Sequence, residues 1–99
     1  MNSIYELKLN DMKKLSRKEI EEKVNEILVD KLCVTEEEVK PEASLEDDLG
    51  ADSLDAVESI MEVEREVDIT IPDEEVSVMK SCKVSDVYDI VEKIQNQQR

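Results

Sequence analysis

Apolar residues recur at helical spacing in four stretches of the chain. In residues 16–32 they form one apolar face and leave the opposite face charged, as in an amphipathic helix. The same spacing predicts a helix over residues 53 to about 67, a short one after Pro72 and a last one from Val84 to about residue 94. The pattern therefore predicts an all-α protein.

The start of the first helix is marked by a local motif. Ser16 is expected to be the N-cap, and Glu19 completes a capping box with it. Thr35 and Glu38 repeat this box on a smaller scale after the helix has ended. Residues 33–52 are thus expected to form a long but structured loop.

Residues 1–15 precede the first helix. Tyr5, Leu7 and Leu9 alternate as in a strand, yet the same segment half fits a helix. A chain of 99 residues provides for one core of ordinary size. We therefore expect one domain over residues 16–99, preceded by an N-terminal extension over residues 1–15.

Composition narrows the possible functions. The chain has 27 acidic and 13 basic residues, a formal net charge of −14 and no histidine. Nucleic acids and anionic lipids repel such a chain, so its partners are expected to be basic. Without histidine there is no Ser-His or Cys-His nucleophile pair and no histidine-ligated zinc. We therefore expect no catalytic residue, no metal site and no enzymatic activity of the chain itself.

The apolar runs are too short to cross a membrane. The longest is three residues, as at Ile27–Val29, whereas a transmembrane helix needs about 20. Cys33 and Cys82 belong to no CxxC pair, so both are expected to be reduced thiols that serve in packing. These features predict a soluble, cytoplasmic protein with no membrane insertion.

The negative charge is concentrated in the middle of the chain. Residues 46–75 carry 13 acids and a single base, Arg65, and contribute −12 of the net −14. A charge run of this kind is most often a solvated face. Because like charges repel, we expect salt or magnesium to stabilise the fold.

The helix expected over residues 53–67 has two apolar stripes. The first suits a core-facing side and consists of Ala56, Ile60, Val63 and Val67. The second lies about 120° away, among acidic residues, and consists of Leu54, Val57 and Met61. This second stripe is either an exposed docking site or is covered by residues 33–52 or 1–15, and the pattern leaves both open.

Ser53 stands at the head of this helix, three residues after the only glycine, Gly50. Gly50 permits a positive φ and a tight turn, and a serine at such a point is most often an N-cap. A calcium loop starting at Asp47 is excluded because Leu49 and Ala51 occupy ligand positions. A nucleophilic serine lacks a base. If Ser53 reacts, another enzyme must activate it.

Two motifs in this region carry a family resemblance. The first is Asp52-Ser53-Leu54 within the run 46–55, and the second is Ile-Pro-Asp-Glu-Glu at residues 71–75. Together they resemble the acyl carrier proteins of dissociated fatty acid synthesis, over about residues 16–94. The resemblance implies a four-helix bundle with a long loop between the first two helices and a short third helix.

The resemblance also implies roles for individual residues. Ser53 would carry 4′-phosphopantetheine, donated from coenzyme A by a phosphopantetheinyl transferase that recognises Asp52, and the arm would hold acyl chains as thioesters. Basic-surfaced fatty acid synthesis enzymes would bind a monomeric carrier at Leu54, Asp55, Val57, Glu58, Met61 and Glu62. The acyl chain would be sheltered by Ile60, Val63, Val67, Ile69 and Ile71.

Some positions depart from the family pattern. Leu45 and Val67 stand where phenylalanine is common, Ser59 stands where leucine is usual, and Cys33 stands where glycine usually ends the first helix. Smaller core side chains would change the space left for an acyl chain. Two alternatives therefore stay open: a specialised carrier (polyketide, D-alanyl or aminoacyl, or lipid-modification) and an unmodified acidic interaction module.

Overall fold

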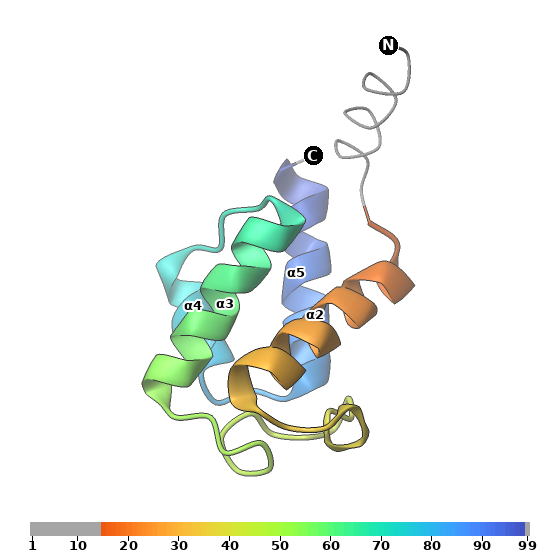
Figure 1. Cartoon of the computed structure of the whole chain (residues 1–99). Coiled ribbons are helices and arrows are strands. Elements are labelled where there is room, and N and C mark those ends of the chain that lie inside the picture. Colours follow the sequence, from red (N-terminus) through yellow and green to blue (C-terminus); the bar gives the residue numbers. More distant parts are fainter. Residues whose placement is uncertain (1–14, 99) are drawn as a thin grey trace.

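The computed structural model describes residues 15–98, which fold into four α-helices around one apolar core (Figure 1). The helices are α2 (Arg17–Leu32), α3 (Ser53–Val67), α4 (Asp73–Met79) and α5 (Val84–Gln98). A short 3₁₀ helix, η1 (Glu36–Glu38), lies in the loop between α2 and α3. Within residues 15–98 no strand forms, which confirms the all-α bundle with a long first loop and a short third helix.

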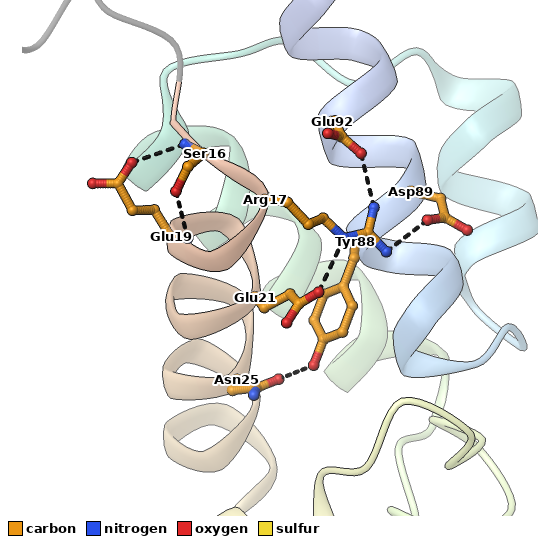
Figure 2. Close-up of polar contacts among 8 residues, drawn as sticks. All are labelled: Ser16, Arg17, Glu19, Glu21, Asn25, Tyr88, Asp89 and Glu92. Carbon is orange, nitrogen blue, oxygen red and sulfur yellow. Dashed lines mark hydrogen bonds and ion pairs between the residues drawn. The ribbon is translucent and has the colours of Figure 1, made fainter.

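Both predicted capping boxes are confirmed. The hydroxyl of Ser16 accepts a hydrogen bond from the Glu19 backbone N–H, and the Glu19 carboxylate accepts one from the Ser16 N–H at 2.8 Å (Figure 2). Thr35 and Glu38 make the same reciprocal pair at the start of η1. These bonds satisfy backbone donors that a helix start otherwise leaves without partners.

The loop between α2 and α3 forms part of the core. Leu45, near its middle, is almost completely buried. Its backbone N–H donates to the carbonyl of Cys82 at 3.0 Å, and the N–H of Val84 donates to the carbonyl of Ala43 at 2.9 Å. The loop is thereby fixed against the turn that leads into α5, and it closes one end of the bundle.

A polar cluster joins the first turn of α2 to α5 (Figure 2). The Arg17 guanidinium lies 5.5 Å from the centre of the Tyr88 ring, and the Tyr88 hydroxyl donates to the side-chain oxygen of Asn25. Three carboxylates accept from this guanidinium at 2.8–3.0 Å: Glu21, Asp89 and Glu92. The hydrogen bond to Asp89 is the main cause that raises the pKa of Arg17 above its ordinary value. The cluster fixes how α2 lies against α5.

Two helices end on a residue with a left-handed backbone. Cys33, the C-cap of α2, has φ 56°, and Asp68, the C-cap of α3, has φ 62°. Glycine is favoured at such positions because it has no Cβ to clash with the neighbouring carbonyl. The cysteine at residue 33 therefore occupies a conformation that costs it free energy.

None of the helices in residues 15–98 combines the length and the apolar character that a bilayer crossing requires. Of the extension expected over residues 1–15, only Leu15 is among the described residues. Leu15 packs against the apolar core.

Candidate functional site

The turn before α3 depends on its glycine. Gly50 has φ +72°, as the sequence predicted, and a Cβ built there would meet no atom within 4 Å. The left-handed conformation, not lack of space, is thus the reason for glycine at this position. On either side of the turn the side chains of Leu49 and Ala51 are buried, so the chain leaves the core only briefly before α3 begins.

Asp52, and not Ser53, is the N-cap of α3. The Asp52 carboxylate accepts a hydrogen bond from the Asp55 N–H at 2.8 Å, and the Asp55 carboxylate accepts one from the Asp52 N–H at 3.5 Å. The interpretation of Ser53 as a capping residue is therefore wrong. Aspartate is as good a cap as serine, and here it stands one residue earlier.

Ser53 is the first residue of α3, and its side chain is exposed. Within residues 15–98 its hydroxyl has no hydrogen-bond partner. The chain also contains no histidine to remove its proton. Within the described residues, the geometry presents an accessible primary alcohol on a corner of the molecule, with no side chain hydrogen-bonded to it that could activate it.

The two apolar stripes of α3 have opposite environments. The residues of the first stripe are all buried: Ala56, Ile60, Val63 and Val67. In the second stripe Leu54 is 64% exposed, Met61 is 52% exposed and Val57 is half-buried. The loop over residues 33–52 does not cover this second stripe. The alternative that residues 1–15 cover this stripe concerns residues 1–14, which lie outside the described part of the chain.

Carboxylates border the second stripe, as expected. Glu58 is exposed, whereas Asp55 and Glu62 are half-buried. Arg65 pairs with Glu62 at 2.7 Å, so the one basic residue of the segment 46–75 is already engaged on this helix. The surface beside Ser53 is therefore apolar in its centre and negative around it.

The residues expected to shelter an acyl chain share one property: each is buried in the core cluster, namely Ile60, Val63, Val67, Ile69 and Ile71. The carboxylate of Glu64 accepts a hydrogen bond from the Ile71 N–H at 2.6 Å and so fixes the segment that leads into α4. Met79, at the end of α4, is fully buried in the same cluster, although the sequence pattern did not single it out. A seven-residue helix is too short for its periodicity to show which residue faces the core.

Ser59 is buried as well, being only 2% exposed. Its hydroxyl donates to the carbonyl oxygen of Asp55 at 2.9 Å, one turn earlier in α3. This bond satisfies the hydroxyl within its own helix. A small side chain thus stands where a leucine would fill more of the interior.

The family model for the phosphopantetheine attachment site matches residues 22–91. The match begins within α2 and ends within α5, so it contains Ser53 and both stripes of α3.

Proposed function

Because the chain belongs to the family that carries a phosphopantetheine attachment site, we propose that it is an acyl carrier protein with its prosthetic group on Ser53. The family match establishes 4′-phosphopantetheine as the group attached to this domain. The arm supplies a terminal thiol that holds acyl groups as thioesters. The chain's own residues present the attachment point, bind partners and shelter the cargo.

The position of Ser53 is the observation that carries the proposal. Its hydroxyl is exposed at the first residue of α3, while Asp52 performs the capping. Attachment of a phosphate ester at Ser53 would therefore break none of the hydrogen bonds that start the helix. The N-terminal end of α3 also suits a phosphate, since its backbone N–H groups carry partial positive charge.

Loading and delivery would depend on the surface beside Ser53. Asp52 lies next to the attachment point, where a transferase would contact it. We propose Leu54, Val57 and Met61 as the apolar contact for partner enzymes, with Asp55, Glu58 and Glu62 attracting their basic surfaces. Charge speeds the encounter, and a small apolar area limits the affinity, so release stays fast. A cytoplasmic, monomeric carrier would use these contacts for one enzyme after another.

Intact mass spectrometry tests the proposal directly. The folded protein is incubated with coenzyme A and a broad-specificity phosphopantetheinyl transferase, beside Ser53→Ala and Ser81→Ala. Ser81 is a second exposed serine, distant in sequence from α3, so it serves as the matched control. We expect the mass of one phosphopantetheine on the wild type and on Ser81→Ala, and no gain on Ser53→Ala. Absence of any gain would instead support an unmodified acidic interaction module.

The cargo separates a fatty acid carrier from a specialised one. The acidic surface and the leucine after Ser53 favour an acyl carrier over a peptidyl one. Three core positions filled by smaller side chains, Leu45, Ser59 and Val67, favour a different cargo. The mass of the thioester isolated from cells decides between them. Saturated acyl groups of several chain lengths would indicate fatty acid synthesis, whereas an aminoacyl load or a chain with several oxo groups would indicate the specialised role.

A further inference from the structure

Arg65, the one base in the acidic segment 46–75, lies in the last turn of α3. Counted along the helix from Leu54, it stands eleven residues on, after Glu58 at four and Met61 at seven. Residues at this spacing share one face of an α-helix, because each residue is turned by about 100° from the one before. Arg65 therefore continues the proposed docking face at its far end.

This end of the face presents the guanidinium rather than the carboxylate paired with it. Arg65 Nη1 donates to the Glu62 Oε1 at 2.7 Å, but the Arg65 side chain is 70% exposed and that of Glu62 only 21%. The acids on either side of the arginine are engaged elsewhere: Glu64 accepts from a backbone N–H before α4, and Glu66 pairs with Lys23 of α2. The face is thus negative near its start and carries a positive group at its end.

We propose, resting on the function proposed above, that these opposite charges fix the direction in which a partner enzyme lies along α3. Glu58 and Arg65 are seven residues apart, which is about 10 Å along the helix axis. A matching partner has basic groups opposite Asp55 and Glu58 and a carboxylate about 10 Å farther on, a group that the planar guanidinium binds well. In the reverse direction both ends would meet like charges, which disfavours that alignment.

The phosphopantetheinyl transferase is the partner to test, because a chain of this family must bind the enzyme that attaches its prosthetic group. Arg65 lies twelve residues after Ser53, about 18 Å along α3. A standard interface covers about 800 Å² on each partner, so an enzyme acting at Ser53 can contact both residues. A transferase attracted by negative charge alone would bind better if residue 65 were acidic, whereas one that offers a carboxylate there would bind less well. The two accounts predict opposite signs.

The KM of the transferase from the same organism is measured for the full-length wild type, Arg65→Glu, Arg65→Lys and Lys31→Glu. Lys31 is exposed in the last turn of α2, so its reversal matches Arg65→Glu in net charge and in position at a helix end. We expect Arg65→Glu to raise KM about three- to ten-fold with kcat unchanged, and Arg65→Lys to stay near the wild type. Lys31→Glu should not raise KM. An unchanged or lowered KM for Arg65→Glu would overturn the proposal.

Carbodiimide cross-linking, which joins an amine to a carboxylate, locates the acidic group on the transferase. The amine introduced by Arg65→Lys should be joined to an acidic residue of the enzyme, and peptide mapping identifies both ends. Cross-links formed only by other lysines of the carrier would contradict the proposed contact. A wild type that gains no phosphopantetheine would instead overturn the proposed function, and the mass spectrum shows this before any KM is measured.

Discussion

The side-chain amide of Gln95 makes two hydrogen bonds with the backbone of Leu15, which lies 80 residues earlier. The Leu15 N–H donates to the Gln95 Oε1 at 2.8 Å, and the Gln95 Nε2 donates to the Leu15 carbonyl at 3.0 Å. Gln95 is only 1% exposed, and this pairing gives both the oxygen and the nitrogen of its amide a hydrogen-bond partner. The bonds fix the residue just before α2 against α5.

We expect Gln95→Met to lower the free energy of unfolding by about 1–3 kcal/mol, since it keeps the volume but leaves two backbone groups of Leu15 without their partners. Urea denaturation measures the change. Gln97→Met, at an exposed position of the same helix, is the matched control and should change the stability little. Equal effects of the two variants would show that the pairing with Leu15 contributes nothing.

The left-handed C-cap of α2 leads to a stabilising variant. Cys33→Gly should raise the free energy of unfolding by about 0.5–1 kcal/mol, because relief of the strained conformation outweighs the greater flexibility of glycine in the unfolded chain. Cys33→Ala keeps a Cβ and should show no comparable gain. Thermal denaturation under reducing conditions checks both variants. A gain in the alanine variant equal to that in the glycine variant would attribute the effect to the thiol rather than to the backbone.

The two cysteines should differ in reactivity. Burial is the main cause that raises the pKa of the Cys82 thiol to about 11, with the nearby Asp86 carboxylate adding to it, whereas Cys33 is exposed. Alkylation by iodoacetamide at about pH 8 requires thiolate, so we expect one adduct on the folded protein, at Cys33, and two after unfolding. Peptide mapping locates them. Modification of Cys82 in the folded protein at a rate similar to Cys33 would contradict this assignment.

The same pKa shift has a consequence for stability. From its ordinary value of 9.0 the pKa of Cys82 rises to about 11 in the folded protein, so above pH 9 the unfolded chain releases this proton first. The contribution of the neutral thiol is complete below about pH 9 and is lost as the pH rises toward 11. Cys82→Ala should therefore show a shallower fall in melting temperature over this range. A fall of equal steepness in the variant and the wild type would exclude Cys82 as its source.

Magnesium should raise the melting temperature without a specific site. The stabilisation is expected to come from screening of the −12 net charge of residues 46–75. Calcium should then act like magnesium, and sodium chloride should act at higher concentration. Glu58→Gln should melt higher than the wild type at low salt and gain less from magnesium. A melting temperature that stays flat or falls with magnesium would refute the screening account.

The helix boundaries could be predicted because local chemistry sets them. The capping boxes at Ser16 and Thr35 satisfy backbone groups within three residues, so neither depends on the rest of the fold. The interpretation of Ser53 as an N-cap was wrong by one position, since Asp52 and Ser53 are both good capping residues and periodicity does not locate a helix end to a single residue. The spacing of Leu54, Val57 and Met61 predicted the second stripe of α3. The sequence could not show whether the loop over residues 33–52 covers that stripe.

The rest of the structure depends on contacts between distant segments. Arg17 and Tyr88 are 71 positions apart, and neither residue type signals the other in the sequence. Gln95 gave a weak signal, since it is a polar residue among the apolar positions of the last helix. Such a residue needs a buried partner, but only the packed structure shows that the partner is the backbone of Leu15.

Because Asp52 caps α3, the start of the helix does not depend on the side chain of Ser53, to which the prosthetic group is proposed to be attached. Asp52 supplies the capping bond, so the hydroxyl of Ser53 makes no contribution to the stability of the helix start. If Ser53 carries the arm as proposed, the protein can pass between its unmodified, phosphopantetheine-bearing and acylated forms without a change in the hydrogen bonds that start α3. This independence gives engineers freedom at residue 53: its side chain can be exchanged for another attachment chemistry while the scaffold around it stays intact.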